Sequence, residues 1–125
     1  MARILIADDA PIARAMLRKL LEQMGHCVVG EAENGKKAVE RYRALRPDLV
    51  VLDITMPVMN GIEATKGIKK VAPETAVLVL TAYDDDQYVF AILEAGAAGF
   101  LLKNARGSEL IDAVRRVHAG ESVLH

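Results

Sequence analysis

The sequence has no tryptophan, and aromatic residues make up only 4% of its 125 residues. Hydrophobic residues nevertheless account for 52% of the chain, which is enough apolar material for a full core. That core must therefore be aliphatic, built mainly from valine, leucine, isoleucine, alanine and methionine. A chain of this length is typical of a single domain.

Cysteine is almost absent as well, since Cys27 is the only one in the chain. A single cysteine excludes an internal disulfide and is typical of a reducing compartment, so we expect a cytoplasmic protein. Because Cys27 lies in an apolar stretch, its side chain is expected to be buried. None of the histidines has a metal-ligand spacing with Cys27, which predicts that they are surface residues.

The sequence also lacks an excess of positive charge, with 16 Lys and Arg against 17 Asp and Glu and a formal net charge of −1. Binding to a nucleic-acid backbone calls for a basic excess, so this balance argues against such binding as the main function. No apolar run approaches the roughly 20 residues of a membrane span. We therefore expect no direct contact with nucleic acid and no membrane association.

Strand-like and helix-like patterns alternate five times along the chain. The predicted strands cover residues 4–7, 27–32, 48–53, 76–81 and 99–102, and the predicted helices cover residues 11–24, 35–45, 62–71, 85–95 and a segment that starts near 108. The third and fourth strands are continuously apolar, which indicates a parallel sheet covered by helices on both faces. Each crossover should be right-handed. The sequence therefore predicts a doubly wound α/β domain.

Two of the predicted helices have recognisable sequence features at their ends and faces. Asp9 is expected to cap the first helix and Ser108 the last one. In the first helix an apolar stripe at every fourth position predicts the face that packs on the sheet. The residues of this stripe are Ile12, Met16, Leu20 and Met24, with Ala13, Leu17 and Leu21 beside them.

Four of the apolar runs end in a polar residue suited to phosphoryl chemistry. Asp8 and Asp9 follow the first run, Asp53 the third, Thr81 the fourth and Lys103 the fifth. Open α/β sheets bind ligands at the carboxyl edge of their strands, so these side chains are expected to meet there. The set predicts an acidic cluster for a divalent cation beside a hydroxyl and an ammonium group that could hold phosphoryl oxygens.

Mg²⁺ suits this predicted cluster because it takes oxygen ligands, few of them protein carboxylates. Asp9 and Asp53 could bind it directly, Asp8 could act through a water, and the backbone carbonyl of Thr55 could supply a further oxygen. Without a cation, adjacent carboxylates repel one another and destabilise the fold locally. The sequence therefore predicts Mg²⁺ as the cofactor.

With these residues in view, the chain resembles the receiver domains of bacterial two-component response regulators, the fold of the chemotaxis Y protein. The resemblance covers essentially the whole chain and rests on Asp8-Asp9, Asp53-Ile54-Thr55-Met56-Pro57, Asn60-Gly61, Thr81-Ala82 and Gly99-Phe100-Leu101-Leu102-Lys103. It implies a flavodoxin-like (βα)5 sandwich with five parallel strands in the order 2-1-3-4-5.

The resemblance implies a role for each residue of the predicted site. Asp53 would accept a phosphoryl group from a histidine kinase, and Asp8 and Asp9 would organise Mg²⁺. Thr81 and Lys103 would then bind the phosphoryl oxygens. This agrees with the physical requirements of phosphoryl transfer, which needs in-line positioning and neutralisation of oxygen charge more than covalent assistance.

In the family, a threonine or serine moves toward the phosphoryl group and an aromatic residue turns inward to fill the vacated space. Here these residues are Thr81, followed by Ala82, and Phe100, where many relatives carry tyrosine. Two further positions, Thr55 and Tyr83, would flank the path of an attacking water. We expect the bulky Tyr83 to slow loss of the phosphoryl group.

The end of the chain resembles NarL/FixJ-type regulators, which join a receiver to a helix-turn-helix DNA-binding domain. We therefore predict a receiver domain over residues 1–120 and the start of a linker over residues 121–125. Many receivers have proline after the lysine, often with a cis bond, whereas Asn104 follows Lys103 here. A cis bond without proline costs roughly 2.5–4 kcal/mol, so we expect a trans bond.

The implied partners are a histidine kinase and an output domain or separate protein. The output surface would be the fourth helix, fifth strand and fifth helix, or else the first and fifth helices. The resemblance also allows a homodimer that forms on phosphorylation. Control of transcription is the expected output.

Two other classes of protein compete with this interpretation. A phosphatase or phosphotransferase with an aspartyl-phosphate intermediate commonly carries a second acid two residues after the nucleophile, where this chain has Thr55. We therefore expect no enzyme activity beyond transfer and hydrolysis of the chain's own phosphoryl group. A flavodoxin-like cofactor binder needs a phosphate-cradling first loop, whereas Asp8 and Asp9 would repel a phosphate in the absence of a cation.

Overall fold

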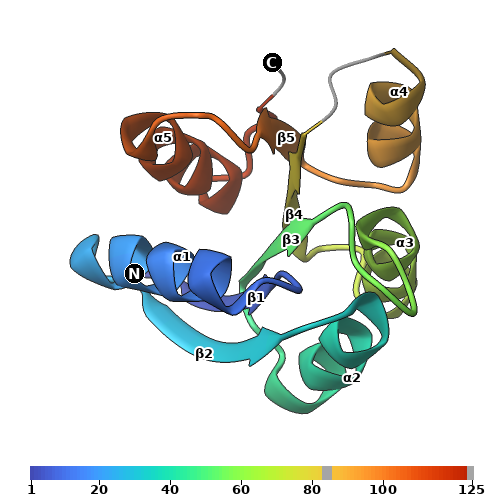
Figure 1. The fold of residues 1–125 in the computed structure, drawn as a ribbon, viewed down its shortest axis with the longest axis horizontal. Helices are drawn as coiled ribbons and strands as arrows, with labels where there is room; N and C mark the ends of the chain where they lie inside the picture. The colour runs from blue at the N-terminus through green and yellow to red at the C-terminus, as the bar shows by residue number, and fades with distance from the viewer. Residues whose placement is uncertain (83–85, 124–125) are drawn as a thin grey trace.

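The computed structural model describes residues 1–82 and 86–123, and strands and helices alternate along them as predicted (Figure 1). The strands are β1 (Arg3–Ala7), β2 (Cys27–Ala32), β3 (Leu49–Asp53), β4 (Ala76–Thr81) and β5 (Gly99–Leu102). The helices are α1 (Pro11–Gln23), α2 (Gly35–Leu45), α3 (Gly61–Val71), α4 (Asp86–Glu94) and α5 (Gly107–His118). In this part of the chain, no helix is both long and apolar enough to cross a lipid bilayer.

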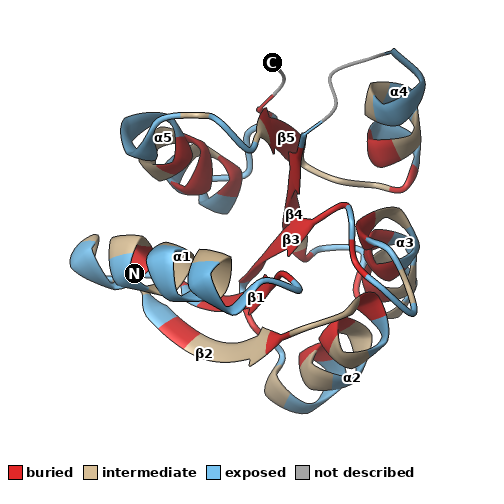
Figure 2. Ribbon diagram, in the orientation of Figure 1, coloured by how far each residue is buried: buried red, intermediate tan, exposed pale blue. Residues whose placement is uncertain are grey.

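The strands form one parallel sheet in the order β2-β1-β3-β4-β5, which confirms the predicted fold class. Helices α1 and α5 cover one face of the sheet, and α2, α3 and α4 cover the other (Figure 1). Every residue of β3 is buried, as expected for a central strand between two helical layers (Figure 2).

Alternate residues of the central strands face different helical layers. Leu5, Val50 and Leu52 belong to the core cluster that includes residues of α2, α3 and α4. Their neighbours Ile6 and Val51 belong to the second cluster, which includes residues of α1 and α5. The continuous apolar runs of the sequence therefore fill two cores, one on each side of the sheet.

The predicted buried stripe of α1 is partly wrong. Two residues of the predicted stripe, Ile12 and Met16, are exposed, with 77% and 69% of their surface accessible, whereas Leu21, which the same stripe included, is fully buried. Ile12 and Leu21 are nine residues apart, which places them on roughly opposite sides of a helix with 3.6 residues per turn. A row at every fourth position drifts around the helix, so its first members leave the face that packs on the sheet.

Both predicted helix caps are also wrong. The residue before α1 is Ala10, which makes no side-chain cap, and Asp9 does not serve as one. Instead, the Ala10 N–H donates to Oδ1 of Asp8 at 2.9 Å, and Pro11 begins the helix with no N–H to satisfy. The residue before α5 is Arg106, so Ser108 lies inside the first turn.

Several predicted element boundaries move by one residue, and one local environment differs from the prediction. Strand β3 starts one residue later than predicted, whereas β1 and α3 start one residue earlier, and α1 and α4 each end one residue earlier. The predicted start of the fourth helix, at residue 85, lies outside the described residues. Cys27 is exposed rather than buried, because it is the first residue of the edge strand β2. Assignments of element ends commonly differ by this much, and none of these changes alters the topology.

The exposure difference along α1 gives a test of its packing. Leu21→Ala should lower the free energy of unfolding by about 2–5 kcal/mol, because it leaves a cavity in the core. Ile12→Ala removes a side chain that is mostly in solvent and should change it by no more than about 0.5 kcal/mol. Urea denaturation of both variants measures this, and equal losses would contradict the packing described here.

Candidate functional site

The carboxyl ends of the strands bring the predicted site residues together. The register pairs Ala7 with Leu52 and Asp53 with Leu80, so Asp8 follows β1 where Asp53 ends β3. Carboxylate oxygens of Asp8, Asp9 and Asp53 lie within 4.8 Å of one another. Asp8 and Asp53 are buried and Asp9 is exposed, so the acidic cluster opens to solvent on one side.

Lys103 supplies the positive charge of the site. Its Nζ donates to Oδ2 of Asp53 at 2.8 Å and lies 3.8 Å from Oδ2 of Asp8. Its backbone N–H donates to the carbonyl of Thr81 at 2.8 Å, which fixes the residue after β5 to the end of β4. The ammonium group therefore reaches across β4 to the nucleophile predicted on β3.

The two carboxylate oxygens of Asp53 have different partners. Oδ2 accepts from Lys103, and Oδ1 accepts from the backbone N–H of Thr55 at 3.2 Å. With these two contacts, the carboxylate is held in one orientation even though it is almost fully buried. A fixed carboxylate beside a cation suits in-line attack on a phosphorus atom.

The loop after β3 is held closely by two glycines. A β carbon on Gly61 would lie 2.4 Å from the carbonyl oxygen of Asp53, and one on Gly35 would lie 2.1 Å from the carbonyl oxygen of Met59. The Gly35 N–H also donates to that Met59 carbonyl at 2.9 Å. Glycine is required at both positions, because any larger residue would push this loop away from α2 and α3.

The same loop contains one tight turn with a strained residue. The N–H of Met59 donates to the carbonyl of Pro57 at 2.7 Å, and Val58 between them has a φ of 69°. This is the geometry of a γ-turn with positive φ, which is rare and strained for a residue with a β carbon. The strain lies five residues after Asp53, in the loop that borders the acidic cluster.

Burial and charge shift the ionisation of the site. Burial raises the pKa of Asp8, and the charges of Asp53 and Asp9 add to this effect against the opposing N–H of Ala10 and the charge of Lys103. Burial acts to lower the pKa of Lys103, but the hydrogen bond and charge of Asp53 and the charges of Asp8 and Asp9 outweigh it, so the pKa is raised. The ammonium group therefore stays charged, while the carboxylates of the cluster repel one another.

The donor set fits a hard divalent cation such as Mg²⁺. Three carboxylates converge on one small region, and burial, together with the charges of Asp53 and Asp9, raises the pKa of Asp8. Mg²⁺ takes oxygen ligands and keeps several waters, so one open side on the cluster suits it. Asp8, Asp9 and Asp53 are the residues that would hold it.

The remaining predicted site residues occupy different environments. Thr81 and Phe100 are buried, whereas Thr55 and Ala82 are exposed. The aromatic ring of Phe100 belongs to the core cluster on the α2–α4 side of the sheet. The peptide bonds of the described residues include no cis bond, as predicted for Lys103 and Asn104. Tyr83 lies outside the described residues, and its role in phosphoryl lifetime stays a prediction.

Several residues that build the site were not predicted from the sequence. Asn60 caps α3 and its N–H donates to Glu63, which forms a capping box at the end of the loop after Asp53. The pattern Asn-x-x-Glu could have revealed this cap. Arg14 donates to the backbone carbonyl of Asp8 at 2.6 Å, for which the sequence carries no local signal.

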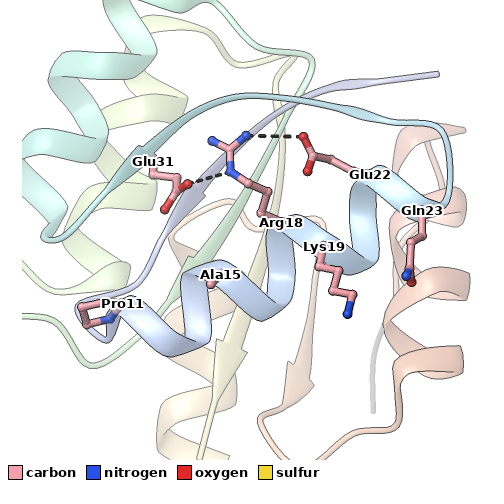
Figure 3. A pocket seen from close by; sticks show the side chains of 7 residues that line it. All are labelled: Pro11, Ala15, Arg18, Lys19, Glu22, Gln23 and Glu31. Carbon is pink, nitrogen blue, oxygen red and sulfur yellow. Dashed lines mark hydrogen bonds and ion pairs between the residues drawn. The ribbon is translucent and has the colours of Figure 1, made fainter.

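A hollow of about 500 Å³ beside α1 and β2 is a weaker candidate site (Figure 3). Arg18 is its most prominent charged group, and its guanidinium already binds Glu31 at 2.7 Å and Glu22 at 3.4 Å. The lining includes no residue of the acidic cluster. Because its main cation is paired, the hollow offers less chemistry than the strand ends.

Comparison with known proteins places the chain in a family. Residues 4–115 match the model of the response regulator receiver domain. The chain is 43% identical over 115 residues to the chemotaxis protein CheY of Thermotoga maritima, covering 92% of this chain and 96% of that one. The chain therefore belongs to the receiver-domain family of response regulators, which act in phosphorylation-dependent two-component signalling.

Other relatives are longer proteins that contain a similar region. The transcriptional regulatory protein LnrK of Bacillus subtilis is 42% identical over 125 residues, which are 99% of this chain and 57% of that protein. A crystal structure of a two-component response regulator of the LuxR family from Aurantimonas sp. SI85-9A1 superimposes with a TM-score of 0.94 at 36% identity. That match covers 98% of this chain and 89% of the other.

Repulsion within the acidic cluster predicts how the protein responds to Mg²⁺. At a concentration one hundred times its Kd, Mg²⁺ should stabilise the wild type by about 2.7 kcal/mol. Asp8→Asn should gain less than half of this, yet be the more stable protein without Mg²⁺, because it removes one of the repelling charges. Thermal unfolding with and without Mg²⁺ measures both effects, and an equal Mg²⁺ response in the two proteins would contradict the proposed ligand set.

The same pair of proteins gives the pH dependence. A carboxyl whose pKa is raised by folding binds its proton more tightly in the folded state than in the unfolded state. In the absence of Mg²⁺, the wild type should therefore gain stability relative to Asp8→Asn as the pH falls from neutral towards 4. This gain is lost again as the pH rises through the raised pKa of Asp8.

The strained turn predicts a stabilising substitution. Val58→Gly should raise the free energy of unfolding by about 1 kcal/mol, because glycine has no β carbon to be strained at positive φ and the valine side chain is 78% exposed. Val58→Ala keeps a β carbon in the same conformation and should gain less than half as much. Chemical denaturation compares the three proteins, and a loss of stability in Val58→Gly would show that the turn is not strained.

Proposed function

We propose that the chain is a phosphorylation-activated switch that accepts a phosphoryl group from a histidine kinase onto Asp53, with Mg²⁺ bound at the acidic cluster. One observation carries this proposal: the buried carboxylate of Asp53 lies against the ammonium group of Lys103 and beside the carboxylates of Asp8 and Asp9. A buried nucleophile with a cation on one side and a cation site on the other matches the requirements of phosphoryl transfer.

In the proposed reaction, a carboxylate oxygen of Asp53 forms a bond to phosphorus as the bond between phosphorus and the donor atom breaks. The Thr55 N–H and Lys103 hold the carboxylate in place for this attack. The ammonium of Lys103 then moves from a carboxylate oxygen to a phosphoryl oxygen. Mg²⁺, when bound, supplies further neutralisation of the phosphoryl oxygens.

The phosphorylated state of Asp53 is reversed when water attacks the phosphorus atom. This releases inorganic phosphate and returns Asp53 to its carboxylate. A second carboxylic acid placed to protonate a leaving group would make the chain a phosphatase, and the position two residues after Asp53 holds the exposed Thr55 instead. We therefore propose that the chain acts only on its own phosphoryl group. Its exposed, unpaired Cys27 is compatible with a cytoplasmic location.

The proposed kinase surface is the groove between α1 and α5. This groove of about 580 Å³ has an apolar floor that includes Leu20 and Leu110, and it reaches Asp8 and Lys103. Met16, which the sequence predicted to be buried, lines it instead with 69% of its surface accessible. A helical partner that fills this groove would bring its phosphoryl donor beside the acidic cluster.

The proposed output surface is the face formed by α4, β5 and α5. The alternative is the face of α1 and α5, which becomes free after the kinase has dissociated. Phe90 and Leu93 of α4 are exposed, with 63% and 39% of their surface accessible, beside strand β5. Transcription is the proposed output, because the chain matches just over half the length of transcriptional regulatory proteins such as LnrK. A homodimer that forms on phosphorylation is part of this proposal.

The direct test is the intact mass of the chain after incubation with acetyl phosphate. The wild type should gain one phosphoryl group in the presence of Mg²⁺ and none after chelation. Asp53→Asn should gain none under either condition, whereas Asp48→Asn, a matched change at the opposite end of β3, should behave as the wild type. Equal phosphorylation of the wild type and Asp53→Asn would place the acceptor elsewhere and contradict the proposal.

A further inference from the structure

The chain after α5 returns to the sheet and pairs with β5 (Figure 1). Val123 lies parallel to Gly99, beyond the last named strand of the sheet. Its N–H donates to the carbonyl of Ala98 at 3.1 Å, and its carbonyl accepts from the N–H of Phe100 at 3.0 Å. The exit segment, residues 121–123, therefore adds to the edge of β5.

The side chain of Val123 anchors this exit segment. It is 2% exposed and belongs to the core cluster that contains Leu101 of β5 and Val114 and Val117 of α5. The backbone fit is equally close, because a β carbon on Gly99 would lie 2.1 Å from the carbonyl oxygen of Val123. Glycine at position 99 is therefore what allows the exit segment to dock.

Strand β5 joins this docked segment to the phosphorylation site. At its amino end, Gly99 and Phe100 hold Val123, and just beyond its carboxyl end Lys103 binds Asp53 at 2.8 Å. The two attachments are separated by one short strand. Any shift of β5 that follows a change in the Lys103 contact should therefore also move the exit segment.

We propose that docking of the exit segment on β5 and phosphorylation of Asp53 stabilise each other, so that β5 transmits the state of the site to the exit segment. This inference rests on the proposed function, because it takes Asp53 as the acceptor. It assigns a structural role to Gly99 and Val123, neither of which touches the acidic cluster.

The direction of the coupling follows from the contacts of Lys103. In the present structure one hydrogen bond to Asp53 holds its ammonium group, and the side chain is 39% exposed. A phosphoryl group offers additional oxygens to the same ammonium, which restrains the carboxyl end of β5 more tightly. A restrained β5 opens less often, so a segment paired with it should also be released less often.

Amide hydrogen exchange followed by NMR tests this coupling, with beryllofluoride and Mg²⁺ as the phosphoryl probe. On addition of the probe, exchange at the amides of Phe100 and Val123 should slow by about five-fold or more. Gly99→Ala should speed exchange at both amides and weaken beryllofluoride binding by the same factor, because coupling between two sites is reciprocal.

Matched variants separate this effect from general damage. Gly107→Ala makes the same chemical change at the first residue of α5, where the closest atoms to a β carbon are 3.7 Å away, and it should behave as the wild type. Val123→Ala weakens docking without crowding Gly99 and should reproduce the defect if Gly99→Ala does not fold. The amides of β2, at the opposite edge of the sheet, report any change in global stability.

The outcomes distinguish this inference from the proposed function. If the wild type fails to bind beryllofluoride, the proposed function is contradicted and the coupling is overturned with it. If the wild type binds the probe while exchange at Phe100 and Val123 stays unchanged, only the coupling is overturned. If the exit segment undocks in Gly99→Ala or Val123→Ala and the affinity for beryllofluoride is unchanged, the coupling alone is likewise overturned.

Discussion

The contact between Lys103 and Asp53 is the interaction on which the site depends. It joins residues 50 positions apart in the sequence, and the strand order places one strand, β4, between them. Only a parallel sheet brings the ends of β3, β4 and β5 to the same edge, so the fold itself creates this ion pair. The ammonium group in turn gives the almost fully buried carboxylate of Asp53 a partner of opposite charge.

The site is built at some expense to stability. Three carboxylates share one ammonium group, and Val58 is held in a conformation that valine rarely adopts. Two glycines keep the loop against the site by admitting backbone where a side chain would not fit. Such local departures from the most stable arrangement are expected where a protein binds a cation and changes state.

Much of the fold and site could be predicted because the signals are local. Four of the five apolar runs end in a functional residue, so finding the strands also located Asp53, Thr81 and Lys103. The packing of α1 could be predicted only in part: Leu21 is buried as expected, but a stripe that drifts around a helix does not show that its first members, Ile12 and Met16, leave the sheet. The pairing of Val123 with Gly99 had no signal either, since it depends on the path of the chain after α5.

The most direct test of this account is a double-mutant cycle on Lys103 and Asp53, measured as the free energy of unfolding without Mg²⁺. Lys103→Met leaves the buried carboxylate without its partner, and adding Asp53→Asn removes that charge. We predict that the double variant is more stable than Lys103→Met alone, by about 1 kcal/mol given the partial exposure of the lysine. Additive losses in the double variant would show that the two residues do not depend on each other.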